Sequence, residues 1–161
     1  MTIKFPDGDQ VFRSRLVQTQ TASKTSASST NAHNYSDTGL SKSISVQSGN
    51  VVLVMVCGMV RCDNSGNSGY FEAEGQLRVV RGSTVLKGQT VGFRNSTGNG
   101  KNFFSMISFG FIDSPGAGNH TYKVQVRHHL SASYSNYLIV NRSRDGLYTT
   151  ASTITCSEIE V

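Results

Sequence analysis

The sequence predicts an all-β protein built as an antiparallel β-sandwich or barrel, and three observations support this prediction. Charged residues make up only 16% of the 161 residues, and much of the polarity comes from Ser, Thr, Asn and Gly, which favour turns and strand surfaces over helices. Apolar and polar residues alternate in several short runs. Clusters of turn-forming residues separate these runs, as in a sandwich of short strands.

The alternation is clear along residues 122–127, where Tyr122, Val124 and Val126 are interleaved with polar side chains. Residues 40–46 and 71–79 follow a similar pattern. A period of two is typical of antiparallel strands that have one face in the core and the other in solvent. Neither a helical period nor an internal repeat is visible, so we expect a single sandwich domain.

Two runs break the alternation, because residues 51–56 are apolar at every position and residues 103–107 are nearly so. Burial of one Val or Phe contributes roughly 1.5–3 kcal/mol, so the outer face of such a strand is expected to be covered. We expect another subunit to cover it, with a central strand under a long loop as the alternative. The predicted interface residues are Val52, Val54, Val56, Phe104 and Met106.

The N-terminal part differs from the rest of the chain, because residues 18–34 are nearly all small and polar. Such a segment buries too little apolar surface to offset the entropy of ordering it. We therefore expect residues 1–34 to form an extended arm and residues 35–161 to form the sandwich domain. The arm's candidate docking residues are the apolar Val11, Phe12, Leu16 and Val17.

Several partners and locations are not expected from the composition. The N-terminus lacks the apolar stretch of a secretory signal, and the longest apolar run, residues 51–60, is far below the ~20 residues of a membrane helix. The cysteines Cys57, Cys62 and Cys156 form no disulfide framework, which suits a reducing compartment. The net charge of +5 is spread over single basic residues, so an acidic partner is favoured over nucleic acid.

No group of residues predicts catalysis, a metal or a cofactor. The adjacent His128 and His129 point to opposite faces of a strand, and His128 falls on the core side. Asp113 opens a turn sequence with Pro115 and Gly116 and lacks the strand-to-helix elbow of a hydrolase. Glu72 and Glu74 share a face that we interpret as solvated.

Three stretches resemble small virion structural proteins of tailed bacteriophages, particularly those of cyanobacterial and aquatic hosts. The first runs from Leu16 to Val46 and contains Tyr35, Asp37, Thr38, Gly39, Leu40 and Ser41 in the pattern Y-x-D-T-G-L-S. The second runs from Phe109 to Arg127, and the third is the closing segment from Ser152 to Ile159. Cys156 and Ser157 stand where that group usually has an apolar residue.

The resemblance implies a trimeric jelly roll similar to the heads of tumour necrosis factor and C1q, without enzymatic activity. The short N-terminal arm expected for this chain favours a capsid decoration (cement) protein that binds the major capsid protein or other virion proteins. The alternative is a tail-fibre or head-appendage knob that binds host surface glycans, and a free lectin-like module is less favoured. The implied location is the virion, assembled in the cytoplasm of a bacterial host.

Overall fold

The chain forms only β-strands over the residues that a computed structural model describes, which are 14–30, 34–64, 71–95, 103–128, 136–141 and 151–161. The strands are β1 (Arg15–Lys24), β2 (Ser28–Thr30), β3 (Ser36–Val46), β4 (Val51–Asn64), β5 (Phe71–Arg81), β6 (Thr84–Asn95), β7 (Phe103–Asp113), β8 (Gly118–His128), β9 (Asn136–Val140) and β10 (Ser152–Glu160). The predicted all-β class is confirmed.

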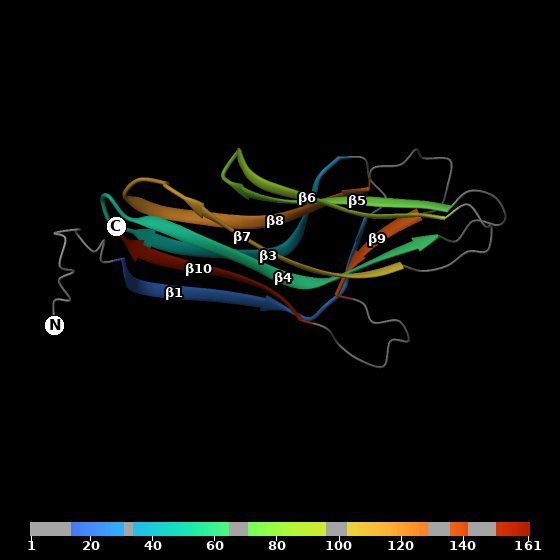
Figure 1. Cartoon of the computed structure of the whole chain (residues 1–161), viewed down its shortest axis with the longest axis horizontal. Helices are drawn as coiled ribbons and strands as arrows, with labels where there is room; N and C mark the ends of the chain where they lie inside the picture. Colours follow the sequence, from blue (N-terminus) through green and yellow to red (C-terminus); the bar gives the residue numbers. More distant parts are fainter. Residues whose placement is uncertain (1–13, 31–33, 65–70, 96–102, 129–135, 142–150) are drawn as a thin grey trace, which may run out of the picture.

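The strands form two antiparallel sheets that face each other (Figure 1). The six-stranded sheet has the order β1-β10-β4-β9-β2, with β7 also paired to β4, and the four-stranded sheet has the order β3-β8-β5-β6. β5 and β6 form a hairpin, whereas the connections β3–β4, β4–β5, β6–β7 and β7–β8 each cross between the sheets. This crossing pattern is that of a jelly roll, so the predicted antiparallel jelly-roll sandwich is confirmed.

The long strand β4 organises the six-stranded sheet. Along one edge it pairs with β7 from Val52 to Cys62, and along the other it pairs first with β10 and then with β9. β10 and β9 meet beside Gly58, where an added Cβ would overlap the side chain of Ser152. The Ser152 hydroxyl hydrogen-bonds Asn141, which adopts a φ of 66° and donates its backbone N–H to the Met59 carbonyl over 3.1 Å.

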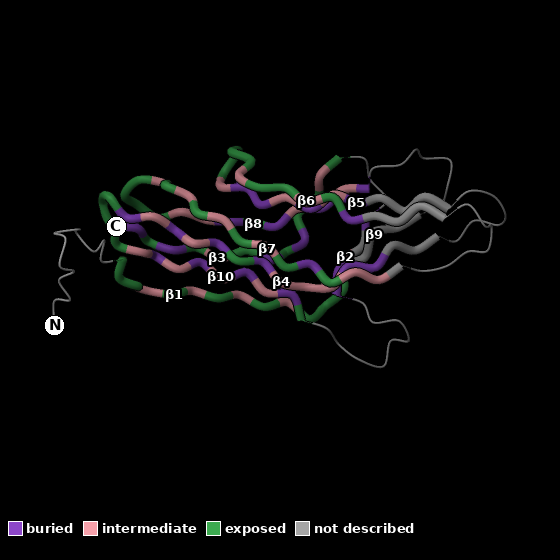
Figure 2. The backbone as a smooth tube through the Cα atoms, viewed as in Figure 1, coloured by how far each residue is buried: buried purple, intermediate pink, exposed green. Residues whose placement is uncertain are grey.

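The core lies between the two sheets and is made by alternate residues of the strands (Figure 2). On β8, Tyr122, Val124 and Val126 are buried, as the alternation predicted. β10 also alternates between buried and half-buried residues along its length. Cys156, which stands where the resembled proteins have an apolar residue, is fully buried in this core and acts there as a small apolar side chain.

The expected boundary of the N-terminal arm is wrong for its second half. Residues 15–24 form β1, which pairs with β10 along its whole length, and residues 28–30 pair with β9. The small polar residues of β1 are ordered by backbone hydrogen bonds and by one half-buried face, so the segment needs few apolar side chains. Residues 1–13, with Val11 and Phe12, lie outside the described residues.

The sequence from Asp37 to Ser41 forms a bulge within β3. The register between β3 and β8 shifts between Asp37 and Ser41, and Gly39 adopts a φ of 79° that favours glycine. The buried Thr38 hydroxyl donates to the Val124 carbonyl over 2.8 Å and accepts from the Leu40 N–H over 3.1 Å. The bulge lets β3 pair on both sides of the irregularity.

Candidate functional site

The outward face of the six-stranded sheet carries a patch of exposed apolar side chains. Residues that oppose each other on neighbouring antiparallel strands share a face, so Leu53 lies beside Ile112 and Met59 beside Met106. Met106 is 83% exposed, Ile112 65% and Met55 45%. We call this set, Leu53, Met55, Met59, Met106 and Ile112, the apolar face.

Uncharged hydroxyl groups extend the apolar face across β10 and β1. Thr21 and Thr155 place their hydroxyl oxygens 3.1 Å apart, and those of Thr19 and Ser157 are 3.0 Å apart. Each hydroxyl has a partner within the sheet, which lowers the cost of covering these groups with another protein surface. The described part of the face is therefore apolar over β4 and β7 and neutral over β10 and β1.

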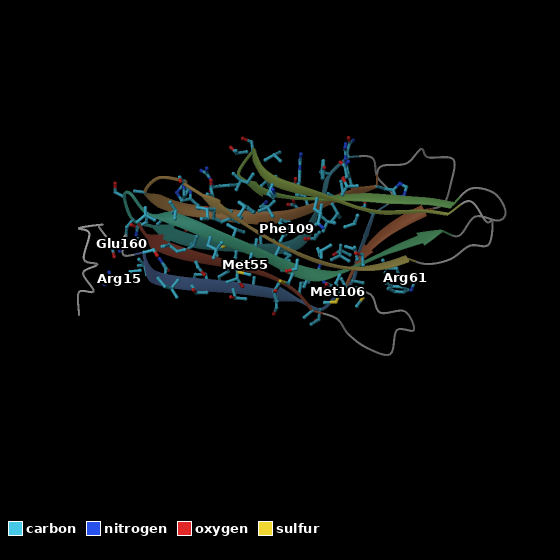
Figure 3. The ribbon with its side chains drawn as sticks, in the orientation of Figure 1. Arg15, Met55, Arg61, Met106, Phe109 and Glu160 are labelled. Atoms are coloured by element: carbon cyan, nitrogen blue, oxygen red, sulfur yellow. The ribbon has the colours of Figure 1, made fainter. Side chains whose placement is uncertain are left out.

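On the outward face of this sheet, the described charged side chains lie toward its two ends (Figure 3), whereas Lys24, midway along, turns its ammonium group to the Thr38 carbonyl of the opposite sheet. Arg15 and Glu160 form an ion pair of 3.0 Å at one end, where β1 begins and β10 ends. Toward the other end, the guanidinium carbon of the buried Arg61 lies 5.3 Å from the centre of the Phe104 ring. Met55 and Met106 lie between these ends (Figure 3).

The predicted interface residues divide between this face and the core. Val52, Val54 and Val56 are all 0% exposed within the single chain, where they pack between the sheets. Their assignment to a subunit interface is wrong, because the period of two turns them inward and the other parity of β4 outward. Met106 does lie on the apolar face, and Phe104 is half-buried beside Arg61.

Of the predicted docking residues, Leu16 and Val17 lie on β1. Leu16 is 62% exposed at the start of the strand, and Val17 is half-buried at a bulge between Leu16 and Gln18. Leu16 is paired with Ile159, so its side chain extends the outer surface of the six-stranded sheet. Its role in docking remains a prediction.

A buried carboxylate ties three separate segments together at one end of the sandwich. Glu158 is 0% exposed and accepts hydrogen bonds from the Gln18 side chain (2.7 Å), the Gln47 backbone (2.7 Å) and the Asn50 side chain (2.8 Å). The Gln47 N–H, followed by the two amides, holds the pKa of Glu158 below its usual value despite burial. The role of this network is structural.

A second polar cluster joins the two sheets. Asp113 of β7 forms a 2.8 Å ion pair with Arg81 of β5 and accepts a 2.8 Å hydrogen bond from the hydroxyl of Tyr122 on β8. Burial, and then the hydrogen bond to Asp113, raise the pKa of Tyr122. Asp113 was expected to serve only a turn, and its partners could not be found without knowing how the strands pair.

The outer face of the four-stranded sheet is polar and basic. Tyr35 stacks on the guanidinium groups of Arg78 and Arg127, whose carbons lie 3.7 and 4.8 Å from the ring centre. Nearby, Asp37 accepts hydrogen bonds from Gln125 (2.7 Å) and Lys123 (3.2 Å). The hydrogen bond from Gln125 and the neighbouring Lys123 lower the pKa of Asp37, and partial burial opposes them.

The sequence contained a partial signal for this basic cluster. Arg78 and Arg127 occupy outward positions of two alternating runs. They lie close together only because β5 pairs with β8, which places Arg78 beside Gln125 and Arg127 beside Gln76. Tyr35 precedes β3 and reaches both arginines only because β3 also pairs with β8. We did not predict this group from the sequence.

Other candidates for chemistry find no support in the described part of the chain. No group of three or more His, Cys, Asp or Glu residues there could hold a metal ion. His128 is buried, as its parity predicted, and a ring nitrogen of His120 hydrogen-bonds the Gly116 carbonyl over 3.1 Å. His33, His129 and the side chains of Glu72 and Glu74 lie outside the described set.

A membrane-spanning helix is likewise not found, since none of the described segments is a helix long and apolar enough to cross a bilayer.

The strand order places the chain among jelly-roll β-sandwich proteins. No known protein family and no curated protein matches the sequence. Among solved structures, a protein of the infectious bursal disease virus Gx strain is 14% identical with a TM-score of 0.39, over 91% of this chain and 38% of that one. The VP2 subviral particle of infectious bursal disease virus is 12% identical with a TM-score of 0.36, over 95% of this chain and 43% of that one.

The chain thus spans less than half the length of these viral proteins. At such identities and TM-scores the likeness says nothing about function, and the jelly roll is assigned from the strand order alone.

Proposed function

We propose that the chain is a non-enzymatic virion structural protein that self-associates through the outer face of its six-stranded sheet. The observation that carries this proposal is the apolar face, where Met55, Met106 and Ile112 are exposed and the outward-facing described positions between the ends of the sheet carry no charge. Contiguous exposed apolar patches are typical of protein interaction sites.

The proposed assembly is a homotrimer, as the resemblance to phage structural proteins implies. Each subunit would place its apolar face against a neighbour and bury an area in or above the ~1,200–2,000 Å² range of stable interfaces. The exposed Arg15 and Glu160, at one end of the sheet, would lie at the rim, whereas Arg61, toward the other end, is already buried within the chain. Charges at a rim cost little because they stay hydrated.

The proposed task is decoration of a capsid. A trimer bound across neighbouring capsid subunits adds contacts between them and stabilises the shell as any bound ligand stabilises the state it binds. The N-terminal residues, with Leu16 at the exposed start of β1, are the proposed contact to the capsid. The function needs no catalytic group.

The test compares particles of the encoding virus with and without the protein. We expect the purified protein to bind the stripped particles and to raise the temperature at which they release their genome. Binding to the tail or neck, with an unchanged rupture temperature, would reject decoration and favour the fibre or appendage knob. A monomer at micromolar concentration in native mass measurements would reject self-association.

A further inference from the structure

We propose that the outer face of the four-stranded sheet carries a second binding site, in which Arg78 and Arg127 pair with carboxylate groups of an acidic protein segment. The site lies on the sheet opposite the apolar face, so it goes beyond the proposed self-association. Both surfaces can be occupied at the same time.

The two arginines come from neighbouring strands and are held by a single aromatic ring. Arg78 of β5 places its guanidinium carbon 3.7 Å from the ring centre of Tyr35, and Arg127 of β8 places its own 4.8 Å from it. Both distances are within the ~6 Å at which a cation is attracted to the face of a ring. The ring therefore brings together two positive groups that would otherwise repel each other.

Hydrogen bonds fix each guanidinium group on one side only. The Nε of Arg78 donates to Gln125 over 2.8 Å, and the Nε of Arg127 donates to Gln76 over 2.8 Å. The Tyr35 hydroxyl also donates to Gln76, over 3.0 Å. Among the described residues no hydrogen bond engages the terminal NH₂ groups of either arginine, so we expect these groups to be available to a ligand.

Among the described side chains, no carboxylate lies within ion-pair distance of either arginine. The nearby carboxylate, Asp37, is taken by Lys123 and Gln125. Both arginines are half-buried and their side chains are already ordered, so a ligand would find, at a low entropic cost, two positive groups that no described carboxylate balances.

The chemistry of the site favours a protein carboxylate. A guanidinium group offers two parallel N–H donors that match the two oxygens of a carboxylate. Two guanidinium groups lie against Tyr35, so its ring is a poor platform for stacking a sugar or a nucleobase. The exposed Asp37 next to the site would repel a continuous polyanion, whereas one or two glutamates or aspartates need contact only the arginines.

The test is a titration with a blocked hexapeptide that carries two adjacent glutamates, followed by NMR at the Nε–H signals of the arginines. We expect saturable shifts of the Arg78 and Arg127 signals at low ionic strength, which salt weakens. Replacement of both residues, Arg78→Gln with Arg127→Gln, should reduce the affinity about tenfold or more. Arg78→Lys with Arg127→Lys should also lose most of it, because the charge stays but the fork is lost.

The matched control is Lys87→Gln, which removes an exposed positive charge from β6 on the same sheet, and it should change the affinity by less than about twofold. The dispersion of the backbone NMR signals shows that each variant is folded. The proposal is overturned if the two arginine signals show no saturable shift, or if Lys87→Gln weakens binding as much as the double variant. Tighter binding of a sulfated disaccharide or an oligothymidine than of the peptide would overturn the assignment to a protein partner.

Discussion

The side-chain amide of Gln18 donates a 2.7 Å hydrogen bond to the carboxylate of Glu158, which lies 140 residues further along the chain. The same amide nitrogen is 2.6 Å from the carbonyl oxygen of Ser45 on β3, in the opposite sheet. Through Gln18, near its first residue, β1 is therefore bound to both layers of the sandwich. Removing either partner should weaken more than one strand.

Glu158→Gln should lower the free energy of unfolding at neutral pH by about 1–3 kcal/mol, because an NH₂ group, which cannot accept a hydrogen bond, replaces one of the two oxygens that accept from Gln18, Gln47 and Asn50. The folded-state pKa of Glu158 lies below the usual value of 4.5, so its stabilisation is complete above pH 4.5 and is lost as the pH falls through the folded pKa. Urea denaturation over this acidic range measures both effects.

The stability of Glu158→Gln should therefore fall less steeply in acid than that of the wild type. Part of the fall should remain, because the pKa of Asp37 is also lowered. Glu160→Gln is the control, because its carboxylate is exposed and pairs only with Arg15 at the end of the sheet. Parallel pH profiles for the wild type and Glu158→Gln would contradict the structural role of the buried carboxylate.

Removal of residues 1–13 and removal of residues 1–24 should have different effects. The pairing of β1 with β10 begins at Arg15, so the shorter deletion leaves every described contact of β1 intact. The longer deletion takes Gln18 from Glu158 and uncovers β10, and it should cost more than about 3 kcal/mol. Thermal unfolding of the two truncated proteins measures this, and equal stability would show that β1 is dispensable.

Val54→Ala should lower the free energy of unfolding by about 1.5–3 kcal/mol without changing self-association. Val54 is 0% exposed between the sheets and cannot touch another subunit. Met106→Ala, at an 83% exposed position, should change the stability of the isolated chain by less than about 0.5 kcal/mol. Denaturation and native mass spectrometry of both variants separate core residues from interface residues.

Met55→Lys combined with Met106→Lys should convert the proposed trimer into folded monomers. A lysine brought into an apolar interface without a partner is strongly unfavourable, whereas both positions tolerate a charge in the exposed monomer face. The matched control is Val85→Lys, an exposed apolar residue of β6 on the other sheet. If native mass spectrometry shows the assembly unchanged in the double variant, the apolar face is not the interface.

The two described cysteines should differ in their reactivity toward iodoacetamide. Burial raises the pKa of Cys156 to about 12, so this thiol should react only after unfolding. Cys57 is half-buried on the outward side of β4, with its sulfur 3.4 Å from the Ser108 hydroxyl. In a Cys62→Ser background, Cys57 should be protected from labelling in the assembly. It should be labelled when Met55→Lys and Met106→Lys make the protein monomeric, and peptide mapping would show the difference.

The sequence alone determined the fold class, because burial in a sandwich imposes a period of two on each strand. Tyr122, Val124 and Val126 are buried as that period requires, and the core position of His128 followed from the same parity. The turn sequence after Asp113 was also recognised, since Gly116 adopts a φ of 79° there. These features are local, so a single segment contains all the information that they need.

The tertiary structure decided which surfaces can bind. A run that is apolar on both sides, such as residues 51–56, does not tell which parity faces the core, and only the pairing of β4 with β7 and β10 shows that Val54 is inside and Met55 outside. The polar segment before residue 25 looked unable to order itself, yet it forms β1 because β10 supplies hydrogen bonds from the far end of the chain. The cluster of Tyr35, Arg78 and Arg127 likewise exists only through the pairing of β3, β8 and β5. Contacts between distant segments depend on the register of the whole sheet, and the register is set by the packing of all strands together.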